Sequence, residues 1–248
     1  MVPVLLLSTR VATAMSLAPV LGPTQIPGPV RVILALVLGG AMALNLPGDV
    51  DAFANITIVS LVVFMLREMV IGASFALGFA AAYAATQVAG RSLDIQIGFG
   101  VAGVLNPATN TFSPLLGSLL GMVGLAIFLA VDGHHQLIRA LALSAQTVRP
   151  GVTTAGFGME AILIQTGAMF VFGLMLAAPI MLALLLVDLT MAIYARSLPQ
   201  LNILVLSFAI KVVLGVLLLG LSLRWSQVVF EHLYQRTFVY WSTQAEGA

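Results

Sequence analysis

The stretch MVIGASFALGFAAAYAATQVAG, residues 69–90, contains no charged residue and few polar ones. A helix needs about 20 mainly apolar residues to cross the hydrocarbon core of a membrane, and this stretch meets that length. Two further charge-free intervals, residues 95–131 and 161–187, are longer still. The sequence therefore predicts a helical protein that is embedded in a membrane.

The composition of the whole chain agrees with this interpretation. Hydrophobic residues make up 60% and charged residues 8% of the 248 positions, whereas soluble domains carry about 25% charged residues. No hydrophilic stretch is long enough to form a second folded unit, so we expect a single membrane domain over residues 1–248. The ten basic and nine acidic residues are scattered singly, which argues against a nucleic-acid partner. The absence of Cys excludes disulfides and thiol chemistry.

The apolar runs also predict the class of fold. We expect an all-α, polytopic membrane protein rather than a barrel, because the runs are continuous instead of alternating along short strands. Several helices should be broken or kinked, since Pro179 lies inside a long apolar run and proline removes a helical hydrogen bond. About six apolar segments are predicted, at residues 4–20, 31–46, 56–89, 114–131, 158–187 and 203–223.

Arg67 and Glu68 stand well inside the third of these segments, and Lys211 stands near the centre of the last. Such residues in membrane helices normally face protein or a water-filled cavity, so we predict that they are buried, with no partner for Lys211 identified. The basic residues flanking the six segments divide four to three between the two sides, which gives no orientation by the positive-inside rule. Either one span is misplaced or the chain inserts as part of a larger assembly.

Small residues recur along the stretch quoted first. Gly72, Ala76, Ala80 and Ala84 stand at every fourth position, and Gly117 and Gly121 repeat the spacing in a later segment. Small residues at this spacing let helix backbones approach closely in a membrane. They are predicted helix-packing positions, either within one bundle or against other subunits.

The connection DIQIGFGVAGVLNPATNTFSP, residues 94–114, has the Gly, Asn and Pro content of a loop or broken helix, but it is too apolar for a solvated loop. Irregular backbone at membrane depth is tolerated where protein buries it or where it lines a cavity. One hypothesis is that its apolar side chains plug a pore, and the alternative is a loop lying in the membrane interface. The residues concerned are Phe99, Val101, Val104, Leu105 and Phe112.

Catalytic chemistry has little support in this sequence. His134 and His135 follow Asp132, but adjacent histidines lack the i, i+4 spacing of a helical zinc motif, and Asp132 is instead expected to cap the next helix. GFGVAG at residues 98–103 lacks the strand, helix and acidic residue of a dinucleotide site. We predict that the chain is not an enzyme and has no catalytic, cofactor-binding or metal-binding residues.

The chain resembles a known family over nearly its whole length, through short motifs whose order and spacing together are specific. These motifs are Arg10, Pro19, Ile26, Pro27 and Arg31; Arg67, Glu68 and Gly72; Gln96, Gly98, Asn106 and Pro107; Asp132, Gly133 and His134; and Pro199, Gln200, Asn202 and Lys211. They are similar to the FliR/SctT family of type III secretion export-gate proteins. The DGHH tract favours the flagellar branch of that family.

The resemblance implies a noncatalytic core subunit of the flagellar export gate in the bacterial inner membrane, at the flagellar basal body. It implies partners homologous to FliP, FliQ and FlhB, contact with membrane lipid, no cofactor, and unfolded flagellar substrates in transit. By the same resemblance, Asn106 and Pro107 join the five apolar residues above in a channel plug loop.

A second class of function stays open at this point, namely a self-sufficient small-solute transporter. In that case Glu68, Lys211 and a broken helix around Pro179 would bind substrate near the bilayer midplane. The two hypotheses differ in a simple observation, because a transporter acts alone whereas a gate subunit requires its partners.

Overall fold

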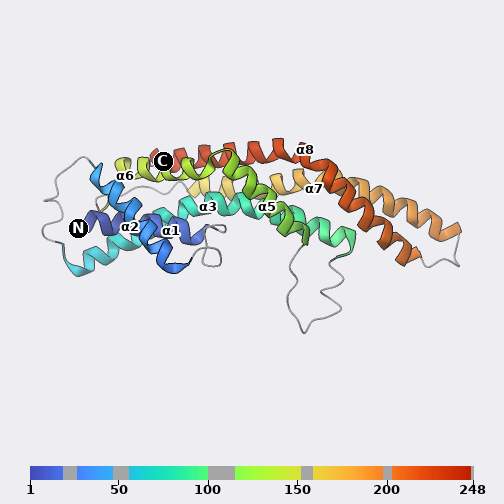
Figure 1. Cartoon of the computed structure of the whole chain (residues 1–248), viewed down its shortest axis with the longest axis horizontal. Helices are drawn as coiled ribbons and strands as arrows, with labels where there is room; N and C mark the ends of the chain where they lie inside the picture. Colours follow the sequence, from blue (N-terminus) through green and yellow to red (C-terminus); the bar gives the residue numbers. More distant parts are fainter. Residues whose placement is uncertain (19–26, 47–55, 100–114, 152–158, 198–202, 247–248) are drawn as a thin grey trace, which may run out of the picture. The chain divides into compact units, whose positions relative to one another are not determined.

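The computed structural model describes residues 1–18, 27–46, 56–99, 115–151, 159–197 and 203–246, and among these it contains helices and no strand. The all-α prediction is therefore confirmed. The helices, shown in Figure 1, are α1 (Val2–Leu17), α2 (Gly28–Leu44), α3 (Ile58–Ile97), α5 (Leu115–Ala130), α6 (Gly133–Thr147), α7 (Met159–Ser197) and α8 (Ile203–Glu246).

Fewer helices are long enough to span a membrane than the six segments predicted. Within the described residues, α3, α7 and α8 qualify by length and hydropathy, and the pair α5 and α6 qualifies together as a fourth, bent span. Helices α1 and α2 have 16 and 17 residues, which at 1.5 Å per residue rise about 25 Å, short of the ~30 Å hydrocarbon core. Helices α1 and α2 correspond to the predicted segments at 4–20 and 31–46, and both are short apolar helices.

The long helices also end later than the hydrophobic pattern predicted. The third segment was expected to stop at residue 89, whereas α3 continues to Ile97; the sixth was expected to stop at 223, whereas α8 continues to Glu246. Polar residues interrupt hydropathy at these points without breaking the backbone hydrogen bonding of a helix. Pro179 lies within α7, which continues on both sides of it.

The chain divides into two compact units. Unit 1 comprises residues 1–82, 128–167 and 234–248, and unit 2 comprises residues 83–127 and 168–233. In unit 1, α1 packs against α2, and buried side chains such as Leu7, Val11 and Phe75 form its core. In unit 2, Leu93, Leu120 and Leu184 are buried. The single membrane domain over residues 1–248 stays a prediction.

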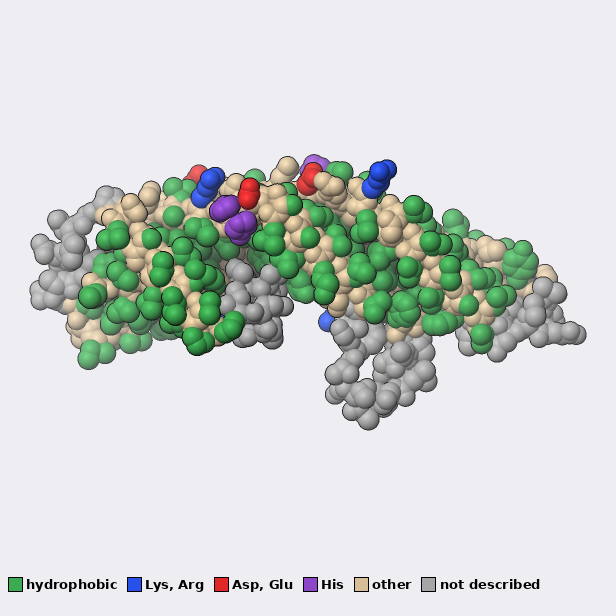
Figure 2. All heavy atoms as spheres, in the orientation of Figure 1, with side chains coloured by type: hydrophobic (Ala, Val, Ile, Leu, Met, Phe, Trp, Pro, Cys, Tyr) green, Lys and Arg blue, Asp and Glu red, His purple; other side chains and the backbone are tan. Residues whose placement is uncertain are grey.

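Much of the apolar surface is uncovered in the chain by itself, and Figure 2 shows hydrophobic side chains over most of the visible described surface. Exposed large apolar residues continue along α7 and α8 of unit 2, where a soluble protein would carry charges. On these two helices they include Phe170, Val171, Leu174, Leu182, Leu185, Leu186, Leu189, Ile193, Val205, Phe208, Val213, Leu217, Leu221 and Trp225.

Candidate functional site

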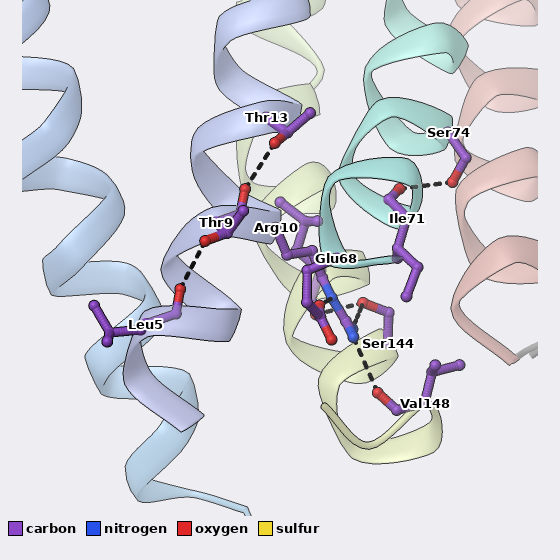
Figure 3. A network of polar contacts seen from close by, with 10 residues as sticks. Leu5, Thr9, Arg10, Thr13, Glu68, Ile71, Ser74, Ser144 and Val148 are labelled. Carbon is purple, nitrogen blue, oxygen red and sulfur yellow. Dashed lines mark hydrogen bonds and ion pairs between the residues drawn. The ribbon is translucent and has the colours of Figure 1, made fainter. Parts of the chain in front are cut away.

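A buried ion pair holds α1 in unit 1. Arg10 is fully buried on α1, and its Nε donates to Oε2 of Glu68 on α3 across 2.6 Å. Nη1 of the same guanidinium donates to Oγ of Ser144 on α6 at 2.9 Å, and Nη2 donates to the carbonyl of Val148 at 3.1 Å. Figure 3 shows the four groups converging between the three helices. A buried charge is tolerated when it is paired and hydrogen-bonded in this way.

Two glycines allow α1 to approach its neighbours in unit 1. A Cβ built on Gly72 of α3 would overlap the carbonyl oxygen of Arg10, and one built on Gly39 of α2 would overlap backbone atoms of Ser8. Absence of these side chains brings the backbones together, as small residues do in membrane helix pairs. Glu68 lies on α3 one helical turn before Gly72. Because α1 approaches α3 closely at Gly72, the guanidinium of Arg10 can reach the carboxylate of Glu68.

The end of α8 is fastened to α3 in unit 1 by side chains that donate to helical carbonyls. Tyr240 Oη donates to the carbonyl of Ser74 and Trp241 Nε1 donates to that of Phe75, both at 2.9 Å. Both aromatic side chains are buried. A carbonyl oxygen has two lone pairs, so it accepts these bonds without giving up its helical one.

In unit 2, α3 and α5 come into direct backbone contact. A Cβ on Gly90 would overlap both N and Cα of Gly117, so the two backbones touch. Gln87 Nε2 donates to the carbonyl of Gly117 at 3.2 Å, and Gly121, one turn further on, faces the ring of Tyr83. Gly117 and Gly121 thus lie in a helix contact within the chain.

Two polar side chains near the end of α3 bind backbone groups of unit 2. Asp94 is fully buried, and its Oδ1 accepts the backbone N–H of Leu116 in the first turn of α5 at 3.2 Å. Gln96 Nε2 donates to the carbonyl of Met181 on α7 at 2.9 Å. Helix N-termini leave such N–H groups without intrahelical acceptors, so Asp94 caps α5 from a distant part of the sequence.

The partner of Lys211 is Asp188. Lys211 Nζ on α8 forms an ion pair with Oδ1 of Asp188 on α7, with side chains 17% and 40% exposed. Both helices belong to unit 2. The pair neutralises each charge within long apolar helices, which lowers the cost of placing either in a nonpolar medium.

The other predicted positions have different surroundings. Arg67 is exposed in the chain by itself, whereas Glu68 is buried. Gly72 and Ala76 are buried, but Ala80 and Ala84 are half-buried. A step of four residues rotates about 40° beyond one turn at 3.6 residues per turn, so a strict i, i+4 row leaves the buried face after a few steps.

The predicted plug loop lies mostly outside the described residues. Only Phe99 is described, as a half-buried residue directly after α3. The remaining six positions are not among those described: Val101, Val104, Leu105, Asn106, Pro107 and Phe112.

The tract after α5 brings three possible metal ligands together in unit 1. Asp132 occupies the N-cap position of α6 as expected, but its side chain makes no capping hydrogen bond. Its Oδ1 lies 3.1 Å from Nδ1 of His135 instead, and the rings of His134 and His135 are in contact, with centroids 4.1 Å apart and planes tilted by 36°. The predicted N-cap position of Asp132 is therefore confirmed, but its side chain does not form the hydrogen bond expected of an N-cap residue.

Helices long and apolar enough to cross a membrane, with their charged residues Glu68, Asp188 and Lys211 in ion pairs, define the class of this protein as a polytopic helical membrane protein. The family model described as "Bacterial export proteins, family 1" matches residues 1–237. The chain belongs to that family, and the resemblance to FliR and SctT proteins noted from the motifs is confirmed.

Curated relatives agree with the family assignment. The flagellar biosynthetic protein FliR of Escherichia coli (strain K12) is 30% identical over 231 residues, covering 92% of this chain and 87% of that protein. FliR of Bacillus subtilis (strain 168) is 31% identical over 175 residues, covering 69% and 68%. The Yop proteins translocation protein T of Yersinia pestis is 28% identical over 193 residues, covering 75% and 70%.

Proposed function

We propose that this chain is a noncatalytic core subunit of the flagellar type III protein export gate, acting in the bacterial inner membrane at the flagellar basal body. Together with homologues of FliP and FliQ it forms the protein-conducting channel, and a homologue of FlhB is a further partner. Membership of the bacterial export family and the similarity to FliR proteins support this proposal.

The observation that carries the proposal furthest is the length of the apolar helices. Helices α3, α7 and α8 have 40, 39 and 44 residues. About 20 residues of a helix are enough to cross the ~30 Å hydrocarbon core, which is about half of each of these helices. Part of each helix therefore lies beyond the hydrocarbon core.

Helical surface beyond the bilayer needs another cover, because exposed apolar patches of this size are unfavourable in water. On α7 the exposed apolar residues extend from Met159 to Tyr194, a stretch longer than the core is thick. Neighbouring subunits of an assembly can bury these apolar side chains, whereas water would leave them exposed. A chain with these surfaces is suited to a multisubunit complex that projects from the membrane.

We expect the chain to form a single large complex when it is expressed with its FliP and FliQ counterparts. The measurement is native mass spectrometry of the detergent-extracted, tagged chain, produced alone and together with both partners. Several copies of each partner retained with this chain would support the gate. A monomer or homodimer that ignores both partners would instead support the small-solute transporter, and uptake by the purified chain in liposomes would then be measured.

The gate proposal also assigns a sealing role to the loop after α3. Replacement of Phe99, Val101, Val104, Leu105 and Phe112 by Gly is expected to make the assembled complex leak ions, because apolar side chains exclude water from a narrow constriction. The readout is membrane conductance of cells or liposomes containing the complex. Replacement of Phe99, Val101, Val104 and Phe112 by Leu is the matched control, because it keeps apolar side chains in the loop and should not cause a leak. Unchanged conductance in a proven complex would exclude a plug here.

A further inference from the structure

The turn between α5 and α6 places three metal-binding side chains at one point of unit 1. Asp132, His134 and His135 each offer one ligand atom, and these atoms lie within 4.8 Å of one another. Asp132 Oδ1 and His135 Nδ1 are already 3.1 Å apart, and the centroids of the two imidazole rings are 4.1 Å apart. Ligands of one metal ion lie at about 2 Å from it, so a small side-chain adjustment brings all three into one coordination sphere.

The backbone of the turn fixes this arrangement. Asp132 has φ 56° and ψ 32°, the left-handed conformation, and is the non-glycine residue with positive φ among the described positions. Gly133 follows it against the ring of Phe128, where a Cβ would overlap the aromatic carbons. α6 begins at Gly133, so the carboxylate precedes the helix and turns toward its first side chains. In the sequence, the missing i, i+4 spacing of the histidines argued against a metal site. In the structure, the left-handed turn at Asp132 brings the three side chains together without that spacing.

One ring nitrogen of His134 has no hydrogen-bond partner among the described residues. This atom, Nδ1, is shielded from solvent. A shielded polar atom of this kind costs free energy unless something binds it. The remainder of the cluster is accessible, since the side chains of Asp132 and His135 are 69% and 60% exposed. In the chain by itself, an ion can therefore reach these ligand atoms.

We propose that Asp132, His134 and His135 form a site for a divalent transition-metal ion such as Zn²⁺, Ni²⁺ or Co²⁺. Two imidazoles and one carboxylate are the donor set that these ions prefer, whereas Ca²⁺ and Mg²⁺ take oxygen ligands. The chain provides three ligands here, so water completes the coordination sphere. The bound ion links the turn before α6 to the first turn of that helix.

The probe is Co²⁺, which has visible absorption bands on binding, added to the full detergent-purified chain carrying a tag without histidine. We expect a saturable band in the wild-type chain and at least a ~10-fold weaker affinity in His134→Ala, His135→Ala and Asp132→Asn, since even outer-shell changes weaken metal sites by about that factor. His232→Ala removes the third and last histidine of the chain and is the matched control. It should bind Co²⁺ as the wild type does.

A second measurement needs no variant and thus does not depend on how the variants fold. Zn²⁺ should protect His134 and His135, but not His232, from carbethoxylation read by mass spectrometry of the wild-type chain. Equal modification of all three histidines with and without Zn²⁺ would overturn the site. So would a Co²⁺ band that is lost equally in His232→Ala, or the absence of any saturable band.

Discussion

Replacing Arg10 by Met is expected to lower the free energy of unfolding by about 3–5 kcal/mol, because it leaves the Glu68 carboxylate buried without its counter-charge. Arg10 and Glu68 are 0% and 2% exposed and meet at 2.6 Å, so solvent cannot replace the missing group. Glu68→Leu should cost a similar amount for the same reason. The measurement is unfolding in mixed micelles with increasing SDS, followed by circular dichroism.

The double variant Arg10→Met/Glu68→Leu separates the pair from the individual charges. Apolar replacement of both members of a buried ion pair is often neutral or stabilising, so the double variant should recover most of the loss. Arg67→Met is the matched control, since Arg67 is exposed in the chain by itself and surface changes are usually within ±0.5 kcal/mol. If Arg10→Met and Arg67→Met destabilise equally, the pair does not form.

The sequence predicted the class of fold because that class depends on a local property. Twenty or more uncharged apolar residues in succession are visible without any tertiary information, and residues 69–90 and 161–187 both became parts of long helices. The ends of the helices were harder to predict, since hydropathy falls at Arg224 although α8 continues to Glu246. Hydrophobicity reports what surrounds a helix, whereas the helix ends where its hydrogen bonding ends.

The buried charges show where local reasoning stops. A charge in an apolar segment predicts a partner but not its identity, because Arg10 is 58 residues from Glu68 and 134 from Ser144. Charges of opposite sign within or next to the apolar segments were a signal in the sequence: Arg10 with Glu68, and Asp188 with Lys211. Ser144, Asp94 and Trp241 carried no such signal, since Asp94 and Trp241 bind backbone groups, which nearly every residue offers.

The small-residue pattern was informative about chemistry and less so about geometry. Gly72 and Gly117 lie at backbone contacts, whereas Ala80 and Ala84 are only half-buried. Which small residue meets a backbone depends on how two helices cross, and one helix alone does not encode that. Gly90 was not singled out by the spacing, although its backbone meets that of Gly117 where α3 contacts α5 in unit 2.

Gly90→Ala is expected to destabilise the chain by about 3 kcal/mol, the upper end for overpacking, although alanine favours an isolated helix over glycine by about 1 kcal/mol. The new Cβ would overlap N and Cα of Gly117. A backbone cannot rotate away as a side chain can, so α3 and α5 must separate, and the bond from Gln87 to the carbonyl of Gly117 must lengthen. The SDS titration used for the ion pair measures the loss.

Gly220→Ala is the matched change in the same unit, because a Cβ at Gly220 of α8 would meet nothing within 4 Å. Only the helix propensity acts there, so this variant should be stabilised by up to about 1 kcal/mol. The two identical substitutions are therefore expected to have opposite signs. A Gly90→Ala variant that is as stable as Gly220→Ala would show that the backbones of α3 and α5 do not meet at Gly90 and Gly117. Opposite signs would mean that contact with Gly117, and not helix propensity, determines the residue at position 90.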